Sequence, residues 1–340
     1  MPKALIIGPD FYNFNEAVKA AFSAYGYEVE VVKYGTPVDP YDAAARIGYK
    51  LSCDKEAYRA RNRRRRQAFY AAAFDATRPD IVFILNGEIL ASDTLDYFRS
   101  KAKVALWCFD SVMHVPAIKD HIDHVDHFYC YDKGDIDYYA AQGRGALFLP
   151  QAADIAIYHP LEGVQKDIDI LFVGDLYHSP RRQQYIEGVI KAFPERKIKV
   201  AGIYKPWYKD PWGCLTKVDR GIFTNRNLPP AEVNALYNRA RVVLNIHNEQ
   251  QSDGANPKVF EICAAGAYQI CDVNPYIRDL FPDGEVGLYD GPKQMISLIR
   301  EALEGDMAEN AARARQTVLQ RHTFGNRMGI VINDLNNLKA

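Results

Sequence analysis

Short apolar runs alternate along the chain with longer stretches in which apolar residues recur at helical spacing. In the first half, amphipathic stretches at residues 16–25 and 55–75 follow such runs, the second being long and mostly polar. The apolar runs of this half are Ala4–Gly8, Val29–Tyr34, Asp80–Leu85, Lys103–Phe109, His127–Tyr131 and Ala146–Leu149. This alternation is typical of βαβ units and predicts an α/β fold with a parallel sheet.

The pattern stops at Pro150–Leu161, which holds two prolines and little periodicity, and then restarts. Strands are predicted at 168–174, 197–202, 241–246, 268–272 and 285–289, and helices at 180–192, 229–239, 257–265, 292–304, 307–320 and 325–338. The prediction is therefore two Rossmann-like domains, at 1–152 and 153–322. We expect a C-terminal helix within 323–340 to pack back on the first domain.

Composition narrows the class of protein but not its chemistry. The 340 residues suffice for two domains, and 48% hydrophobic with 25% charged residues is ordinary for a globular protein. The net charge of -1 gives no general attraction to nucleic acid or an anionic membrane. With no leader-like or membrane-spanning run, we expect a cytoplasmic protein without stable membrane insertion. The six cysteines form no C-x-x-C pair and most lie in apolar runs, which favours reduced, buried thiols and neither a disulfide framework nor a zinc site.

Parallel sheets of this kind bind ligands beyond the carboxyl ends of their strands, so two sheets predict a site in the cleft between two facing domains. The most informative segment there is Asn245–Asp272, read as strand, polar loop, helix and strand. The helix opens at Pro257, and its free N–H groups suit a diphosphate. Lys258 adds a full positive charge. Glu261, one turn further, can accept hydrogen bonds from the vicinal hydroxyls of a ribose.

Other residues near strand ends are candidate contacts of the same ligand. Gly174 ends a predicted strand, where a backbone can approach a ligand closely, and Arg181 follows at the start of a helix. Asn245, His247 and Asn256 lie around the polar loop and are candidates for the base or the phosphates. For Asn245 and His247, a satisfied polar strand end is an equal alternative.

Asp253 and Glu261 are eight residues apart, with Gly254 after the first and Ala264-Ala265-Gly266 after the second. This resembles the acidic-x7-Glu signature of retaining GT-B glycosyltransferases, with Asp in place of the usual Glu at 253. The resemblance implies that Glu261 holds the nucleotide ribose and that Asp253 contacts the donor sugar. It also implies a UDP- or GDP-linked sugar as co-substrate, and no bound metal. Arg181, Lys258 and the helix dipole would then offset the charge of the leaving group.

The chain also resembles the CgeB-like branch of these enzymes, the spore maturation type with a glycosyl transferases group 1 C-terminal domain. Five stretches in the family order carry this resemblance: Trp107–Asp110, Pro150–Asp154, Phe172–Tyr177 with Arg181, Lys258–Glu261, and His322–Phe324 with Arg327. They imply a hexosyltransferase. The acceptor is left open among protein, polysaccharide, lipid and small molecule, and no nucleic-acid partner is expected.

Two chemical routes stay open in the N-terminal half. The resemblance implies that in a retaining enzyme the departing phosphate takes the acceptor proton. An inverting enzyme needs a side-chain base, for which Asp110, His114 and Glu88 at predicted strand ends are candidates. The eight-residue spacing favours retention. A non-catalytic nucleotide- or sugar-binding module and a GT-B-fold sugar-nucleotide epimerase remain alternative functions.

Three further features have both a functional and a structural interpretation. His121, His124 and His127 recur every third residue, but this step drifts by ~60° per pair on a helix, so a metal cluster is not favoured. The arginine-rich run Arg59–Arg66 covers every face of a helix and is interpreted as solvated, with an anionic acceptor or a membrane surface as alternatives. The aromatic loop 202–212 either packs or stacks on a base or sugar.

Overall fold

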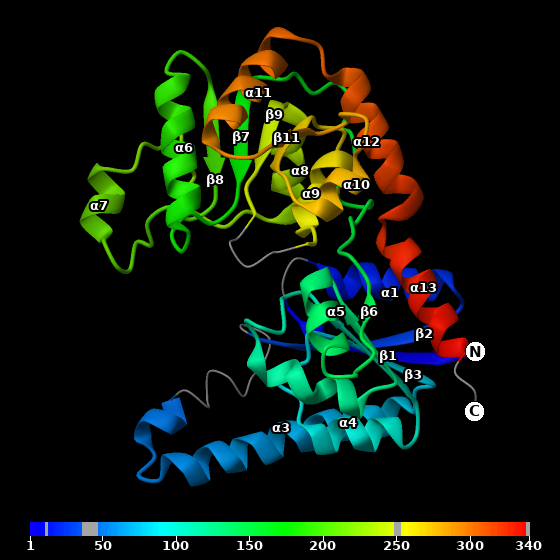
Figure 1. Cartoon of the computed structure of the whole chain (residues 1–340). Helices are drawn as coiled ribbons and strands as arrows, with labels where there is room; N and C mark the ends of the chain where they lie inside the picture. Colours follow the sequence, from blue (N-terminus) through cyan, green and yellow to red (C-terminus); the bar gives the residue numbers. More distant parts are fainter. Residues whose placement is uncertain (11–12, 36–46, 248–252, 338–340) are drawn as a thin grey trace. The chain divides into compact units, whose positions relative to one another are not determined.

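The computed structural model describes residues 1–10, 13–35, 47–247 and 253–337 of the chain. They form two units, Met1–Pro150 with Phe324–Ala340 and Gln151–Thr323. Each unit is an α/β layer structure around one parallel sheet, as Figure 1 shows. Within the described residues, no helix combines the length and the apolar character needed to cross a membrane.

The sheet of the first unit has six parallel strands in the order β2-β1-β3-β4-β5-β6. The strands are β1 (Lys3–Pro9), β2 (Glu28–Tyr34), β3 (Ile81–Leu85), β4 (Lys103–Cys108), β5 (His127–Cys130) and β6 (Leu147–Phe148). Strand β1 lies between β2 and β3, with Ile6 opposite both Val31 and Phe83. Every residue of β3 is buried, since helices cover both faces of the sheet.

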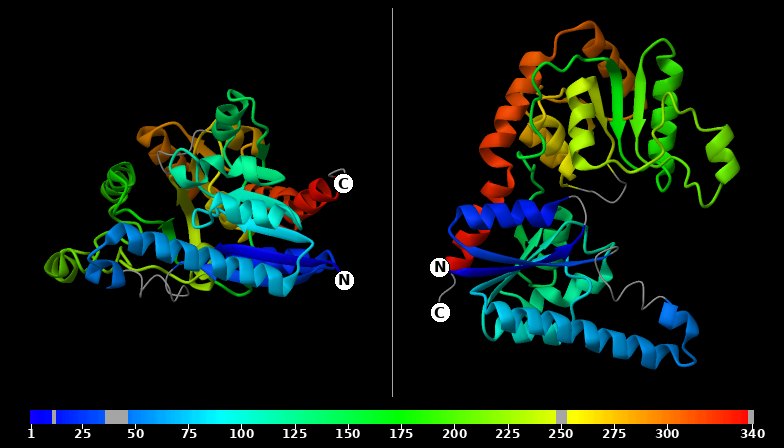
Figure 2. Two further views of the ribbon diagram at one scale, coloured as in Figure 1. Left: turned by 90° about the horizontal axis from the view of Figure 1, so that it is seen from below. Right: turned by 180° about the vertical axis from the view of Figure 1, so that it is seen from behind.

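The helices of the first unit divide between the two faces of its sheet (Figure 2). They are α1 (Phe14–Ala24), α3 (Lys55–Thr77), α4 (Ser92–Arg99), the 3₁₀ helix η1 (Pro116–His124), α5 (Lys133–Ala140) and α13 (Phe324–Asn336). Tyr70 and Phe74 of α3 pack with Leu95 and Phe98 of α4 on one face. On the other, Phe22 of α1 packs against Phe83 of β3, with ring centroids 5.6 Å apart.

The last helix, α13, is far from this sheet in sequence but belongs to the same unit. The hydroxyl of Tyr129 on β5 donates to Asp334 Oδ2 at 2.8 Å, and Lys103 Nζ donates to the Leu335 carbonyl at 2.7 Å. Arg327 Nε donates to the Pro150 carbonyl at 2.7 Å. These contacts attach the end of the chain to the sheet of its first half.

The sheet of the second unit has five parallel strands in the order β11-β10-β9-β7-β8. The strands are β7 (Ile168–Val173), β8 (Ile198–Ala201), β9 (Ala240–Asn245), β10 (Gln269–Asp272) and β11 (Gly287–Tyr289). The helices are α6 (Pro180–Ala192), α7 (Pro211–Thr216), α8 (Pro230–Arg239), α9 (Pro257–Ala264), α10 (Pro275–Leu280), α11 (Pro292–Glu304) and α12 (Ala308–Arg321). Alternate sheet residues, such as Phe172 and Leu244, form one core with the apolar sides of α6 and α11.

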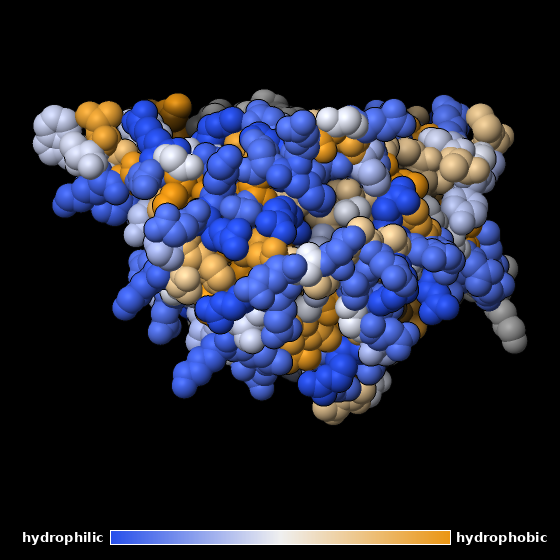
Figure 3. Space-filling model, turned by 90° about the horizontal axis from the view of Figure 1, so that it is seen from above, coloured by the Kyte–Doolittle hydropathy of each residue, from blue (hydrophilic) through white to orange (hydrophobic). Residues whose placement is uncertain are grey.

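The surface shown in Figure 3 is mainly hydrophilic, with apolar residues in small groups between charged and polar ones. Such scattering is ordinary for a surface in contact with water. The cysteines match the sequence interpretation in part. Cys108, Cys130, Cys263 and Cys271 are buried free thiols, whereas Cys53 is exposed.

Candidate functional site

The second sheet changes direction between β7 and β9. The chain runs from β7 outward to β8 and then returns to the other side of β7 to form β9. At such a switch point the connections leave in opposite directions, so an opening forms beyond the carboxyl ends of the two strands. Gly174 follows β7, and Ile246 and His247 follow β9. A methyl group added at Gly202, after β8, would lie 2.1 Å from the Gly174 carbonyl oxygen. The ends of β7 and β8 therefore approach each other closely.

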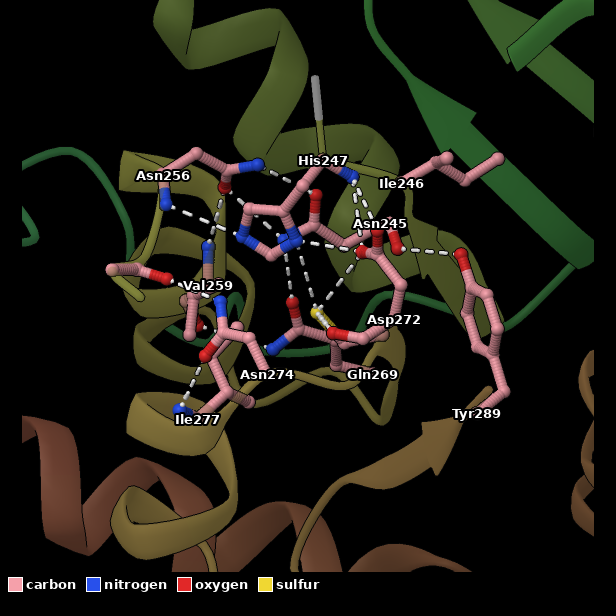
Figure 4. A network of polar contacts seen from close by, with 12 residues as sticks. Asn245, Ile246, His247, Asn256, Val259, Gln269, Asp272, Asn274, Ile277 and Tyr289 are labelled. Atoms are coloured by element: carbon pink, nitrogen blue, oxygen red, sulfur yellow. Dashed lines mark hydrogen bonds and ion pairs between the residues drawn. The ribbon is translucent and has the colours of Figure 1, made fainter. Parts of the chain in front are cut away.

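At this edge the carboxylate of Asp272, the last residue of β10, is bonded to His247, which follows β9 (Figure 4). It accepts the backbone N–H of His247 at 3.0 Å and lies 2.6 Å from Nδ1 of the same imidazole. Its second oxygen accepts Arg181 Nη2 at 3.0 Å. Burial would raise the pKa of Asp272, but the His247 hydrogen bonds and Arg181 outweigh it and hold this pKa below its usual range.

The hydrogen bonds also define the tautomer of His247. The Asn256 N–H donates to His247 Nε2 at 3.3 Å, so Nε2 is an acceptor and Nδ1 carries the proton given to Asp272. His247, Cys271 and Asp272 lie close enough to be considered as metal ligands. In this structure both ring nitrogens of His247 are used in hydrogen bonds, Nδ1 with Asp272 and Nε2 with the Asn256 N–H.

A second network joins Asn245, Asn256 and Gln269 next to the first (Figure 4). Asn245 Nδ2 donates to Asn256 Oδ1 at 3.1 Å and to Gln269 Oε1 at 3.0 Å, and Asn256 Nδ2 returns a bond to Asn245 Oδ1 at 3.0 Å. Asn256 Oδ1 also caps α9 by accepting the Val259 N–H at 3.2 Å. Both polar groups of the Asn245 amide are thus engaged. These bonds fit the alternative of a satisfied strand end, and a contact of Asn245 with the nucleotide stays a prediction.

His247 and Asn256 are also bonded to neighbouring residues, and their predicted contacts with the nucleotide stay predictions. His247 is 4% exposed, and both its ring nitrogens are bonded to Asp272 and to Asn256. Together these residues fix where α9 begins relative to the ends of β9 and β10. Residues 248–252 of the predicted loop lie outside the described residues.

Helix α9 starts at Pro257 and presents Lys258 and Glu261 from its first turns. Glu261 is 7% exposed, and burial raises its pKa to about 7 against the opposing effects of Lys258 and of a hydrogen bond from the Tyr158 hydroxyl. Burial also lowers the pKa of Lys258, while the charge of Glu261 raises it. A half-buried cation at the positive end of a helix dipole is suited to a phosphate, although Pro257 has no N–H and the Val259 N–H is bonded to Asn256. A buried carboxylate one turn away is suited to hydroxyl groups.

Arg181 and Arg182 open α6 and differ in their surroundings. Arg182 is 8% exposed, and its Nε donates to the Ile246 carbonyl at 2.8 Å, so it holds the end of β9. Arg181 is about one-third exposed, pairs with Asp272 and lies over the Tyr185 ring at 5.2 Å. Arg181 is therefore the cation of this pair that an anionic ligand can reach.

Asp253 lies just before α9 and contacts a different helix. Its Oδ1 accepts the backbone N–H of Tyr276 at 2.6 Å, in the first turn of α10. One carboxylate oxygen therefore stabilises a helix start. The predicted contact of Asp253 with a donor sugar stays a prediction.

The N-terminal candidates lie at the carboxyl ends of β3 and β4. Asp110 is exposed, and its Oδ2 accepts Asn86 Nδ2 at 3.2 Å. His114 is exposed as well. Glu88 accepts the Tyr34 hydroxyl at 2.7 Å, and desolvation raises the pKa of Glu88 against that hydrogen bond. Asp110 and Glu88 are near enough to interact electrostatically, so the first unit does present two carboxylates at one sheet edge.

The structure also shows the surroundings of two of the histidines and of the aromatic loop. His121 Nε2 lies 3.1 Å from the Gly87 carbonyl and His124 Nδ1 2.8 Å from Asp96 Oδ1, so these two imidazoles serve different partners. In the aromatic loop, Tyr204 stacks on Phe223 at 4.7 Å and so packs. Trp207 and Trp212 are 73% and 74% exposed.

Sequence reasoning missed Asp272 and Arg182, two residues that bond to several of the strand ends. Asp272 is the last residue of a strand, so its place at the carboxyl edge is a usable signal. Its pairing with His247, 25 residues away, is not visible in the sequence. Arg182 is adjacent to the predicted Arg181, but which of the two faces the sheet depends on the rotation of α6.

Comparison with known proteins gives a family match for part of the chain. Residues 181–333, somewhat less than half of the chain, match the family described as glycosyl transferase-like. No curated protein matches the sequence.

Solved structures resemble the whole chain at low identity. Sucrose-phosphate synthase from Thermosynechococcus elongatus has a TM-score of 0.69 at 11% identity, covering 100% of both chains. An alpha,alpha-trehalose-phosphate synthase (UDP-forming) from Burkholderia vietnamiensis has a TM-score of 0.68 at 14% identity, covering 99% of this chain and 100% of that one. A putative UDP-N-acetylglucosamine 2-epimerase from Listeria monocytogenes has a TM-score of 0.59 at 13% identity, covering 99% and 97%.

At these identities the similarity establishes the fold. The chain has the GT-B fold, with two Rossmann-like units, as the sequence predicted. The family match in the second unit, taken with this fold, supports a glycosyltransferase.

Proposed function

We propose that the chain transfers a hexosyl group from a nucleotide-diphosphate sugar to an acceptor hydroxyl, with retention and without a bound metal, as a CgeB-like enzyme. The observation that carries this proposal is the start of α9. Lys258, the positive end of the α9 dipole and the buried carboxylate of Glu261 lie together at the switch-point edge of the second sheet.

Each group has a part in holding the donor. Glu261 accepts hydrogen bonds from the ribose hydroxyls, and Lys258 with the helix N-terminus neutralises the diphosphate. Arg181 can exchange its contact with Asp272 for a phosphate oxygen and so stabilise the departing nucleotide diphosphate. The donor is UDP- or GDP-linked. UDP is the first choice because one structural neighbour is described as UDP-forming.

The acceptor is presented by the first unit. In the retaining route the leaving phosphate oxygen takes the acceptor proton, so no side-chain base is needed. In an inverting route Asp110, with His114 nearby in sequence, would take that proton. The anomeric configuration of the product, read by NMR, separates the two routes.

The direct test is calorimetric titration of the full chain with UDP and with GDP. We expect one of them to bind, and Glu261→Ala to weaken that binding at least tenfold, since hydrogen bonds to a charged group contribute about 1.5–3 kcal/mol. Glu304→Ala, an exposed glutamate at the end of α11, is the matched control and should bind as the wild type does. Failure of both nucleotides to bind the wild type would overturn the proposal.

A nucleotide-binding module without turnover is the second candidate, because one oxygen of Asp253 already accepts the Tyr276 N–H. Slow donor hydrolysis without an acceptor favours the enzyme. Tight nucleotide binding with no turnover across donors and acceptors favours the module. Acceptor-free conversion of the donor sugar into its epimer would instead indicate an epimerase, the activity by which one structural neighbour is named.

A further inference from the structure

A cavity of about 730 Å³ is lined by residues of the first unit at the carboxyl end of β3. One wall is α3, with the helical turn at residues 47–51 beside it. The other is formed by residues 88–92 after β3 and by η1. Its volume falls in the range of small-molecule pockets, roughly 300–1,000 Å³.

The arginines of α3 fall into two groups, those that line the cavity and those that do not. Arg59, Arg63 and Arg66 line the cavity, together with Asn62. Their spacing of four and three residues places them on one side of the helix. Arg64 and Arg65 do not line it and are exposed. One side of the run therefore concentrates guanidinium groups at a concave site, while Arg59 and Arg63 stay exposed to solvent.

This wall is held in place by hydrogen bonds. Gln67 Nε2 donates to the Ile89 carbonyl at 2.9 Å, and its Oε1 accepts the Ala91 N–H at 3.0 Å, so α3 is attached to the opposite wall. Arg59 Nη2 donates to the Tyr49 hydroxyl at 2.8 Å and its guanidinium lies over that ring at 4.7 Å. These hydrogen bonds fix the position of the helix that carries the arginines.

The opposite wall offers hydrogen-bond acceptors. His121 is 4% exposed and its Nε2 donates to the Gly87 carbonyl at 3.1 Å, so its Nδ1 is an acceptor. Among the residues that the structure describes, Nδ1 has no hydrogen-bond partner. A buried acceptor left without a donor is costly, by about 1–3 kcal/mol, and a ligand hydroxyl would relieve that cost.

Two carboxylates also line the cavity, but both have partners. Glu88 accepts the Tyr34 hydroxyl at 2.7 Å, and Asp120, whose side chain is 81% exposed, lies 3.7 Å from Arg144. The negative charges lie on the wall of acceptors, whereas the three arginines all lie on α3. The cavity therefore has a cationic side and an acceptor side.

We infer that this cavity binds a small hydroxylated anion, a phosphorylated or carboxylated sugar, with its anionic group on Arg59, Arg63 and Arg66 and a hydroxyl near His121. Guanidinium groups bind phosphate and carboxylate oxygens through paired, charge-assisted hydrogen bonds. Resting on the proposed function, the bound anion is the acceptor of the transferred sugar.

The test is calorimetric titration of the full chain with a hexose 6-phosphate, a hexuronate, the neutral hexose and inorganic phosphate. The two sugar anions distinguish phosphate from carboxylate as the bound group. We expect at least one of them to bind at least tenfold more tightly than the neutral hexose, which lacks the charge, and than inorganic phosphate, which lacks the hydroxyls of the sugar.

Matched variants then locate the site. Arg59→Gln/Arg63→Gln should weaken the sugar anion at least tenfold. Arg64→Gln/Arg65→Gln, with the same change of net charge on the same helix, should change it less than twofold. Thermal melts verify that both variants fold. Equal losses in the two variants, or binding only to vesicles rich in anionic lipid, would overturn the inference.

The outcome is separable from that of the proposed function. UDP or GDP binding should be the same in both arginine variants and the wild type. If a nucleotide binds and no sugar anion does, the inference fails and the donor site stands. If a sugar anion binds and no nucleotide does, the cavity stands without glycosyl transfer.

Discussion

The edge of the second sheet and the cavity of the first unit both gather charged and polar side chains, but in opposite ways. At the sheet edge, Asn245, His247 and Glu261 are at most 7% exposed, and their polar groups are bonded to neighbouring side chains or backbone. In the cavity, Arg59 and Arg63 are exposed and Tyr49 supports Arg59 from one side.

This difference indicates different demands on the two sites. A buried, mutually bonded group has one geometry, which suits a ligand of constant shape such as a nucleotide diphosphate. Exposed guanidinium groups on a helix keep several rotamers, which suits recognition by charge. The first site should therefore be sensitive to small changes in any member, and the second to the number of charges present.

The largest expected effect is at Asp272. Asp272→Ala removes the acceptor of the backbone N–H and of the Nδ1–H of His247, and it leaves Arg181 without this partner. The free energy of unfolding should therefore fall by about 3–5 kcal/mol. Urea denaturation measures this. Glu232→Ala, which breaks the exposed pair with Arg226, should cost about 1 kcal/mol or less. Similar losses in both variants would contradict the contrast.

The lowered pKa of Asp272 also predicts that the protein loses stability in acid. Because the folded-state pKa of Asp272 is lowered, its contribution is complete above the unfolded-state pKa and is lost as pH falls through the folded value. The stability difference between wild type and Asp272→Ala should therefore shrink in urea melts as pH is lowered below about 4. A constant difference between pH 7 and pH 3 would show that this carboxylate does not titrate as described.

At Glu261 the dependence of stability on pH has the opposite direction. Its folded-state pKa is raised to about 7, so its contribution is complete at low pH and is lost as pH rises through that value. Glu261→Gln cannot ionise and should be more stable than wild type at pH 8.5, by up to about 3 kcal/mol, with little difference at pH 5. Thermal melts at both pH values measure this, and a gain that is equal at both would rule out ionisation as its cause.

A smaller effect is expected where α13 meets the first sheet. Tyr129→Phe removes the hydroxyl that donates to Asp334 and should cost about 1 kcal/mol in urea denaturation. Nucleotide affinity should not change. A loss of nucleotide binding would show that the attachment of α13 also affects the second unit.

The smallest effect is expected on the outer side of α3. Arg64→Gln alone should change unfolding free energy by less than about 0.5 kcal/mol, because the side chain is exposed and lies outside the cavity. A larger loss in denaturant titrations would mean that the arginine run stabilises the helix as a whole.

Much of the architecture could be predicted from the sequence. Buried parallel strands are continuous apolar runs, so β1, β3, β4, β7 and β9 were visible as such. The short helices α4, α5, α7 and α10 were not predicted, since each has six to eight residues and too few turns to show a period. The start of α9, with Pro257, Lys258 and Glu261, followed from local signals alone.

The sequence by itself thus determined which segments form sheets and which helix start can hold a phosphate, because both depend on residues close together in the chain. Only the tertiary structure decided that Asp272 bonds to His247 and Arg181, and that three arginines of one helix face His121 across a cavity. These pairings join residues far apart in sequence. The order of the strands and the rotation of each helix about its axis, which no local pattern encodes, bring them together.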